Sequence, residues 1–404
     1  MVFIRRNLAI TLVMNILIAT YLTSASPSGV VTYYRTLTND LADVGVDVHT
    51  VDSTSTPIGW RKFLSVLKRV MRPLGNVFYV VYDEFAYFTG VYFSTRKLRR
   101  TTIDLIHAQD VRSGVAAYFA LGRRVPVLLT CHFNGDPVRE LALQFKLKPV
   151  FTQWLTNWYT YLFSHVHQYI FTSEYAYAQS KHLLPEGSQK RIIRNTVQIN
   201  PLDLPGRPSN IAPDQLIISN VGYIDERKNQ QLLLYIGHEL IKRNISDFRI
   251  WIVGDGPKRD EYVMLAQQLG ISERVLFFGQ QSTPWTFVAQ SDLYVHTALD
   301  DNCPYSIVEA FAVGRPVLAL PVGGVPEMVP EGAGLLWGKD VSALTDEVAH
   351  YFGAEARQRL AATQSANAAQ EFNRQINWDA LLSFYKQTIG QSVLVTAQPA
   401  ANAL

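Results

Sequence analysis

The chain alternates between short apolar runs and longer amphipathic segments over nearly its whole length. Continuous apolar runs of about four to eight residues are typical of strands that are buried on both faces of a parallel sheet. The expected strands are residues 14–20, 46–51, 104–108, 125–130, 169–173, 191–194, 216–221, 248–253, 275–278, 293–296 and 317–320. Strands that alternate with helices of about ten to fifteen residues predict doubly wound parallel α/β sheets.

Helices are expected in the segments between these strands. In the first half the clearest are residues 30–41, 63–70 and 138–163. A last helix is expected over residues 376–390, where Trp378, Leu381, Leu382 and Tyr385 form an apolar stripe at helical spacing. Such a stripe indicates core packing and not a binding site. From Gln391 the chain lacks a periodic pattern, so residues 391–404 are expected to be a disordered tail.

A run rich in proline and glycine divides the chain. Residues 200–213 contain four prolines and Gly206, which is the composition of a stiff linker. The economical architecture is therefore two Rossmann-like domains, residues 14–199 and 214–375, that face each other across a cleft. Ligands in such sheets bind beyond the carboxyl ends of the strands.

The beginning of the chain allows two interpretations. Arg5 and Arg6 precede an apolar run over residues 8–22, as in a signal peptide. Alternatively, residues 14–20 are the first strand of the core, and residues 1–13 are an extension or a misassigned start. We favour the strand, because a continuous apolar run suits a parallel sheet and the segments that follow fit it.

Charge and cysteine content narrow the class of protein. The chain has two cysteines, which exclude a disulfide scaffold and fit a reducing, cytoplasmic compartment. The net charge of +3 is unevenly divided: residues 1–200 hold 22 Lys and Arg against 12 Asp and Glu, and the remainder holds 15 against 22. The basic half carries no nucleic-acid motif, so its expected partner is an anionic membrane surface or a phosphate-bearing acceptor.

A basic and aromatic segment bears on the membrane question. Residues 57–101 hold nine Lys and Arg around a run of Phe and Tyr. Basic clusters that flank aromatics suit peripheral docking on anionic lipid. The equally weighted alternative is that the aromatics are core and the charges are ordinary surface charges.

The densest chemistry lies in residues 300–327. Asp301 and Glu309 are separated by seven residues, Pro304 stands where a helix begins, and Gly314 followed by Pro316 ends that helix. The N–H groups at a helix N-terminus bind anions. Acids beside such a site are better explained by sugar hydroxyls that need acceptors than by phosphate, which the acids would repel.

Other motifs follow earlier strands. Ser28-Gly29 follows the first expected strand, and Gly222 with Arg227 and Lys228 follows a later one. A glycine allows close approach of backbone to a ligand, and a lysine provides a point charge for an anion. A Gly254-Asp255-Gly256-Pro257 turn and Gly279 end two further strands, and His132 ends another. The third glycine of a dinucleotide fingerprint is missing after Gly256, which disfavours a Rossmann oxidoreductase.

These motifs, in this order, resemble the family 4 glycosyltransferases of GT-B fold. The resemblance implies that Glu309 accepts hydrogen bonds from a nucleotide ribose and Asp301 holds donor-sugar hydroxyls. It implies further donor contacts from Pro304, Tyr305 and Ser306, and from a diphosphate site of Gly29, Gly222, Arg227 and Lys228, with Gly279 near the base. His132 would lie near the reacting sugar, and the last helix would return to the first domain.

The implied activity is a retaining transfer from a nucleotide-diphosphate sugar to a hydroxyl acceptor, either a glycan or a lipid-linked intermediate of polysaccharide or glycolipid synthesis. The resemblance implies front-face attack, no metal and no other cofactor. The expected location is the cytoplasm, with peripheral docking on the inner face of the membrane as an option that the basic and aromatic segment leaves open. Ser28, Tyr223 and Asp301 depart from the family pattern. A non-catalytic protein that binds a sugar nucleotide, or a nucleotide-sugar epimerase, therefore stays an alternative.

Overall fold

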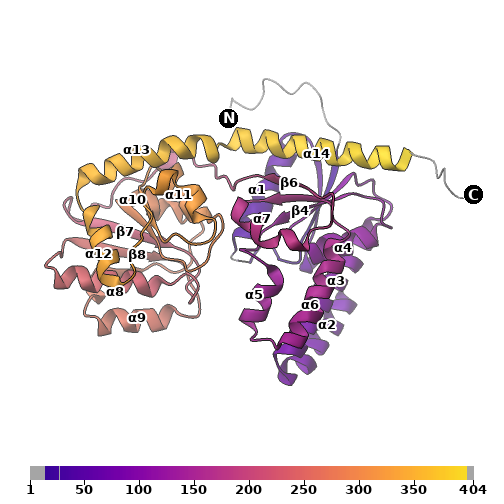
Figure 1. The fold of residues 1–404 in the computed structure, drawn as a ribbon, viewed down its shortest axis with the longest axis horizontal. Coiled ribbons are helices and arrows are strands. Elements are labelled where there is room, and N and C mark those ends of the chain that lie inside the picture. Colours follow the sequence, from indigo (N-terminus) through magenta and orange to yellow (C-terminus); the bar gives the residue numbers. More distant parts are fainter. Residues whose placement is uncertain (1–13, 27, 398–404) are drawn as a thin grey trace, which may run out of the picture. The chain divides into compact units, whose positions relative to one another are not determined.

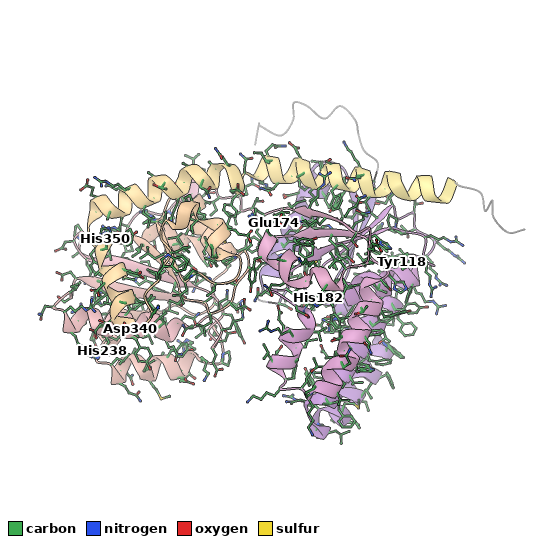
Figure 2. All side chains as sticks on the ribbon, viewed as in Figure 1. Tyr118, Glu174, His182, His238, Asp340 and His350 are labelled. Atoms are coloured by element: carbon green, nitrogen blue, oxygen red, sulfur yellow. The ribbon has the colours of Figure 1, made fainter. Side chains whose placement is uncertain are left out.

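The structure is a computed structural model in which residues 14–26 and 28–397 are described, with backbone alone for residues 331 and 391–397. The chain forms two compact units (Figure 1). Unit 1 contains the chain up to Ile193 and the segment from Asp379 onward, and unit 2 is Arg194–Trp378. Side chains fill the space between the sheets and helices of each unit (Figure 2).

Within the described part of unit 1, six parallel strands form a sheet of order β2-β1-β3-β4-β5-β6. The strands are β1 (Asn15–Ala19), β2 (Asp47–Val51), β3 (Leu105–Ala108), β4 (Val127–Cys131), β5 (Gln168–Phe171) and β6 (Gln189–Ile192). Strand β1 lies between β2 and β3 with Ile16, Leu17 and Ile18 fully buried. The apolar run near the N-terminus is therefore the first core strand, while residues 1–13 lie outside the described residues.

The helices of unit 1 cover both faces of this sheet. They are α1 (Gly29–Asp43), α2 (Ile58–Met71), α3 (Asn76–Thr95), α4 (Val111–Ala120), α5 (Pro137–Gln144), α6 (Pro149–Phe163) and α7 (Glu174–Ser180). The single helix expected over residues 138–163 is wrong, because it divides into α5 and α6. Lys146 has a positive φ of 50°, which is not a helical conformation. Proline is accepted in the first turn of a helix but not in its interior, so a helix cannot run through Pro149, which instead begins α6.

Unit 2 has a second parallel sheet, with five strands among its described residues in the order β11-β10-β7-β8-β9. The strands are β7 (Leu216–Val221), β8 (Phe248–Val253), β9 (Val275–Phe277), β10 (Leu293–His296) and β11 (Val317–Ala319). The helices are α8 (Gln230–Lys242), α9 (Arg259–Gln268), α10 (Trp285–Gln290), α11 (Tyr305–Ala312), α12 (Val341–His350) and α13 (Ala354–Glu371). The predicted fold class of two doubly wound parallel sheets is thus confirmed.

The boundary between the units differs from the expected linker. The units divide after Ile193, and residues 200–213 belong to unit 2. Arg207 forms an ion pair of 2.7 Å with Asp292, and Gln290 donates to the Gly206 carbonyl over 3.2 Å. Residues 200–213 are therefore bound to unit 2 by these contacts, which the proline and glycine content of the segment does not predict.

The last helix, α14 (Arg374–Ala397), begins in unit 2 and ends in unit 1. In unit 1, Tyr385 is fully buried and its hydroxyl lies 2.5 Å from His107 Nδ1. Arg191 bonds the Ala380 carbonyl and Gln387 on the same helix. From Asp379 onward the helix therefore belongs to unit 1. The helix continues past Gln391 to Ala397, where a disordered tail was expected, and residues 398–404 lie outside the described residues.

Over residues 14–26 and 28–397, no helix combines the length and the apolar character that crossing a bilayer requires.

Candidate functional site

The site residues of unit 2 gather where its strand order reverses. The chain runs outward through β7, β8 and β9 and then returns to place β10 on the other side of β7. Gly222 and Lys228 follow β7, whereas Asp301 and Glu309 follow β10. Ligands of doubly wound sheets bind at such a switch point, beyond the carboxyl ends of the strands.

Lys228 and Asp301 meet directly at this switch point. Lys228 Nζ donates to Asp301 Oδ2, and both side chains are largely buried. His296, the last residue of β10, places Nε2 3.1 Å from the same carboxylate oxygen. The lysine expected to bind a diphosphate and the acid expected to bind a sugar are therefore neighbours in one polar cluster.

Backbone contacts fasten the two loops that carry this cluster. Arg227 Nη1 donates to the Asp300 carbonyl over 3.0 Å, and Leu299 N donates to the Arg227 carbonyl over 2.8 Å. Thr297 Oγ1 donates to the Lys228 carbonyl over 2.9 Å. Arg227 thus has a structural contact between the loops in addition to its predicted contact with the donor.

Glycines are required where backbones touch in this region. A Cβ on Gly323, whose φ is +54°, would lie 1.9 Å from the Asp301 carbonyl oxygen. A Cβ on Gly254 would lie 1.9 Å from the Gly222 carbonyl oxygen. Gly254 N also donates to the Gly279 carbonyl over 2.9 Å. Gly222, Gly254 and Gly279 therefore pack together at the ends of β7, β8 and β9, which gives the Gly-x-Gly-Pro turn a packing role.

Helix α11 begins as the sequence predicts. Pro304 is its N-cap and provides no side-chain hydrogen bond to the first turn, which contains Tyr305 and Ser306. The helix ends at Ala312, before Gly314 with a φ of 70°. A helix N-terminus without a side-chain cap presents backbone N–H groups and a positive dipole end to an anion.

Glu309 differs from the other acid of the motif. Its side chain is half-buried, and its carboxylate has no hydrogen bond or ion pair with any described residue. Burial raises the pKa of Glu309 to about 7. Tyr294 lies near both acids, since Asp301 and Glu309 each contribute to raising the pKa of its phenol, after the larger effect of burial.

Asp301 has the opposite electrostatic character. Burial alone would raise its pKa, but the Lys228 ammonium and the His296 hydrogen bond outweigh burial and hold the pKa of Asp301 well below its usual range. Burial lowers the pKa of His296 despite its bond to Asp301. The cluster at neutral pH is therefore a lysine cation, an aspartate anion and a neutral histidine.

The predicted residues of unit 1 follow two different strands: Gly29 follows β1, at the switch point between β1 and β3, and His132 follows β4. Ser28, which replaces a glycine of the family pattern, is the N-cap of α1 and accepts a 3.3 Å hydrogen bond from Val31 N. Gly29 is the first residue of that helix. The departure at Ser28 thus has a local explanation, because serine is among the preferred N-caps.

His132 follows β4 and is held by two neighbours. Its Nε2 lies 2.8 Å from Gln109 Oε1, and its ring makes an edge contact with Tyr33 at 4.9 Å between ring centroids. Burial lowers the pKa of His132 to about 3, so the imidazole is neutral at physiological pH. A neutral imidazole can orient or polarise a hydroxyl but supplies no charge.

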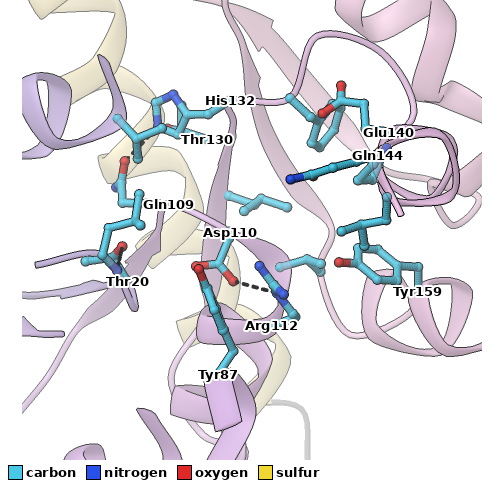
Figure 3. A pocket seen from close by; sticks show the side chains of 17 residues that line it. Thr20, Tyr87, Gln109, Asp110, Arg112, Thr130, His132, Glu140, Gln144 and Tyr159 are labelled. Atoms are coloured by element: carbon cyan, nitrogen blue, oxygen red, sulfur yellow. Dashed lines mark hydrogen bonds and ion pairs between the residues drawn. The ribbon is translucent and has the colours of Figure 1, made fainter. Parts of the chain in front are cut away.

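A cavity of about 240 Å³ opens beside His132 within unit 1. Figure 3 shows Thr20, Gln109, Thr130 and His132 along one side, with Glu140, Gln144 and Tyr159 opposite. Asp110, Arg112 and Tyr87 lie between these two sides (Figure 3). Carboxylates, amides and hydroxyls therefore converge on a space that apolar side chains partly line.

Several of these residues escaped the sequence reasoning. His296 lies at the end of an expected strand, and only this position in the sequence indicated that it could belong to a site. Gln109 and Asp110 follow β3 in the same way, whereas Arg112 and Glu140 lie on helices whose function nothing in their spacing reveals. Across the described ranges, no group of three or more His, Cys, Asp or Glu side chains could hold a metal ion.

Two family models match the chain in succession. The model described as Glycosyltransferase Family 4 matches residues 27–200, and the model described as Glycosyl transferases group 1 matches residues 206–387. The first covers most of unit 1 and the second most of unit 2 with part of the last helix.

Curated relatives include D-inositol 3-phosphate glycosyltransferases of Mycobacterium bovis and Mycobacterium tuberculosis. Each is 32% identical over 190 residues, which is 44% of this chain. The match spans only 38% of the length of those relatives.

Solved structures agree in fold over nearly the whole chain. Sucrose-phosphate synthase from Thermosynechococcus elongatus has a TM-score of 0.71 at 18% identity, covering 94% of this chain and 100% of that one. Anabaena HepE in complex with UDP and glucose has a TM-score of 0.63 at 20% identity, covering 92% and 100%. With both halves matched by their models and the fold shared throughout, this chain belongs to the family 4, group 1 glycosyltransferases of GT-B fold.

Proposed function

We propose that this protein transfers a sugar from a nucleotide-diphosphate sugar to a hydroxyl group, with retention of configuration. The observation that carries the proposal is the arrangement at the β7/β10 switch point, where Lys228 pairs with Asp301, α11 begins at Tyr305 shortly after Asp301, and Glu309 lies on that helix. A cation and a helix N-terminus suit a diphosphate, and two carboxylates suit sugar hydroxyls. HepE is a structural neighbour seen with UDP and with UDP-glucose, which makes UDP-glucose the first donor to test.

Lys228 is proposed to hold the diphosphate without leaving Asp301. An ammonium group has three donors, and the bond to Asp301 uses one of them. As the glycosidic bond breaks, negative charge grows on the leaving diphosphate. Lys228 and the N–H groups of α11 would stabilise that charge, which is how preorganised donors lower a barrier.

Glu309 is proposed to accept hydrogen bonds from the nucleotide ribose. Its carboxylate has no partner among the described residues, and hydrogen bonds to a carboxylate favour the ionised form. Donor binding would thus lower the pKa of Glu309 from about 7 and release a proton. Asp301 would contact donor-sugar hydroxyls with the oxygen lone pairs that Lys228 and His296 leave available.

Attack from the front face requires no protein nucleophile. Asp301, one of the two acids of this motif, is already engaged by Lys228 and His296. In the proposed reaction the diphosphate oxygen accepts the acceptor proton, and the neutral His132 orients the acceptor hydroxyl. Lys228 and α11 neutralise the diphosphate without a metal ion, so we expect a chelator to leave the rate unchanged.

The acceptor is proposed to be a hydroxyl compound of the glycan or polyol type. The mycobacterial relatives are named for an inositol phosphate acceptor, but their match to this chain is partial. A lipid-linked acceptor in polysaccharide or glycolipid synthesis is the other source of the same chemistry.

We further propose that unit 1 docks on anionic lipid through α2. Phe63, Val66 and Val70 share one face of this helix at i, i+3 and i+7 and are all exposed, Val66 by 60%. The helix carries four basic residues and no acid. In α3, Tyr82 is buried and Phe88 and Tyr92 pack against the core, whereas Phe78 and Phe85 are exposed. Only part of the aromatic run is therefore core. Equal binding to neutral and anionic vesicles would contradict the docking proposal.

The test of the main proposal is nucleotide release from UDP-, GDP- and ADP-sugars by wild type and by Glu309→Ala. We expect the substitution to abolish transfer while the circular dichroism spectrum stays unchanged. Glu355→Ala, on the exposed face of α13, is the matched control. Unchanged transfer by Glu309→Ala would refute the donor-site assignment, and donor binding without any turnover would favour the non-catalytic alternative.

A further inference from the structure

The cavity of unit 1 has a charge balance that bears on what it binds. Arg112 is the only Lys or Arg among its lining residues, whereas Asp110 and Glu140 are both acids. Since His132 is neutral at physiological pH, these side chains carry one positive and two negative formal charges. The cavity is therefore net negative, although unit 1 as a whole is basic.

The one cation of the cavity is already neutralised. Arg112 Nη1 lies 2.9 Å from Glu84 Oε1 and 3.6 Å from Asp83 Oδ2, and its Nε lies 3.6 Å from Asp110 Oδ1. Its guanidinium also stacks on Tyr87 at 3.8 Å from the ring centroid. A phosphate group needs unpaired cationic or N–H donors, and this guanidinium is surrounded by three carboxylates.

The remaining polar groups suit hydroxyls. Gln109 is 3% exposed, its Oε1 is bonded to His132, and its Nε2 is buried without a partner in the described structure. A buried donor without a partner is costly unless a ligand or water satisfies it. The carboxylates of Asp110 and Glu140 are acceptors for ligand hydroxyls (Figure 3). Apolar side chains of the lining, among them Leu22, Phe133 and Leu141, offer contacts for C–H groups.

The size of the cavity limits the ligand further. Its volume of about 240 Å³ is below the roughly 300–1,000 Å³ of pockets for drug-sized ligands. This space accommodates a single ring and not an oligosaccharide chain.

We propose that this cavity binds an uncharged sugar or polyol ring of the acceptor and discriminates against a ring that carries a phosphate ester. Only the identification of this ring as the acceptor rests on the proposed function. Binding of the ring can be measured without turnover. Asp110 and Glu140 set the specificity by accepting hydroxyls and repelling phosphate. Gln109 Nε2 supplies the donor.

The experiment is a ligand-observed NMR titration of the full chain with four probes. Methyl α-D-glucopyranoside and myo-inositol are the neutral rings, and glucose 6-phosphate and myo-inositol 1-phosphate are their charged counterparts. We expect the two phosphates to bind at least about tenfold more weakly than the neutral rings. At short range in a protein, the repulsion between a phosphate and a carboxylate exceeds the free energy that a tenfold difference in affinity represents. Equal or tighter binding of the phosphates, or no binding of any probe, overturns the proposal.

Two sets of variants assign the effect to the cavity. The double variant Asp110→Asn, Glu140→Gln should reduce the difference in affinity between the neutral rings and their phosphates to below about threefold. The amides keep the hydrogen bonds to α4 and to the loop before α5 but remove the two negative charges. Asp340→Asn, at the N-cap of α12 (Figure 2), is the matched control and should leave the gap unchanged. A gap that persists in the double variant contradicts the electrostatic explanation.

A cavity-filling variant checks the location. Gln144 lines the cavity and is exposed, so Gln144→Trp should fill the space without disturbing the core and should abolish binding of the neutral rings. Gln153→Trp, exposed on α6, is the control. Ring binding that survives Gln144→Trp places the site elsewhere and overturns the proposal. UDP binding measured in parallel reports on unit 2, so a failure of the donor site is distinguished from a failure of this cavity.

Discussion

Replacing Glu309 with glutamine should stabilise the protein, and only at neutral or alkaline pH. Burial raises the pKa of Glu309 from its ordinary value of 4.5 to about 7. In an unfolded chain the acid ionises near pH 4.5, whereas in the folded protein it stays protonated until about pH 7. The folded state therefore holds one more proton across this window, and stability is lost as pH rises through it.

The size of the effect follows from the shift. Each pKa unit corresponds to 1.36 kcal/mol, so a shift of this size costs about 3 kcal/mol once the acid is ionised in both states. Glu309→Gln removes the ionisation and keeps the shape of the neutral acid. The variant should match wild type at pH 4 and exceed its free energy of unfolding by about 3 kcal/mol at pH 8.

The assay is thermal unfolding of both proteins between pH 4 and pH 8. For a unit of about 185 residues, 3 kcal/mol corresponds to a rise in Tm of roughly 6–12 °C at pH 8. Glu355→Gln on the exposed face of α13 is the matched control and should show no pH-dependent difference. A Tm difference that is constant with pH, or a loss of stability at pH 8, would refute the reasoning. A stabilised but inactive variant is the trade-off expected of a binding residue.

Three further predictions concern the same units. Lys228→Met leaves the buried Asp301 carboxylate without its cation. We expect the affinity for UDP, measured by calorimetry, to fall at least about 100-fold, and the free energy of unfolding, measured in urea, to fall by about 3–5 kcal/mol. Gly323→Ala places a Cβ on the Asp301 carbonyl at a positive φ, so donor binding should be lost, whereas Gly187→Ala, at a positive φ with open space around it, should cost stability alone. His132→Ala should lower kcat while the KM for the donor changes less than about twofold, because the neutral imidazole orients the acceptor and holds no phosphate; a change confined to the donor KM would contradict that role.

Much of the fold was predictable because buried parallel strands leave a continuous apolar signal. All eleven expected strands are present, with bounds that differ by at most two residues. The motif after β10 was predictable because Pro304 and Gly314 mark the ends of α11 in the sequence itself. These features are local, so sequence pattern is sufficient for them.

Features that depend on distant contacts were not predictable. The assignment of residues 200–213 to unit 2 depends on the pairing of Arg207 with Asp292. The break between α5 and α6 has, by contrast, a local signal in Pro149, the first residue of α6, although the positive φ of Lys146 is not visible in the sequence. The bond of His296 to Asp301 joins the end of a strand to the following loop. The ion pair of Arg112 with Glu84 connects two helices. The spacing of these residues in the sequence does not predict it.

The two acids of the motif after β10 resemble each other in sequence but differ in chemistry. Asp301 is paired with Lys228 and His296, so its pKa lies well below the usual range and it is an anion at neutral pH. Glu309 is unpaired, so its pKa is raised to about 7 and its charge depends on what binds beside it. Environments that push two neighbouring acids apart in this way assign them separate roles. Asp301 therefore acts as the fixed partner that positions Lys228, and its shorter side chain suits that contact. Glu309 is the acid whose ionisation a ligand can change, which makes proton release on donor binding the expected signature of Glu309 alone.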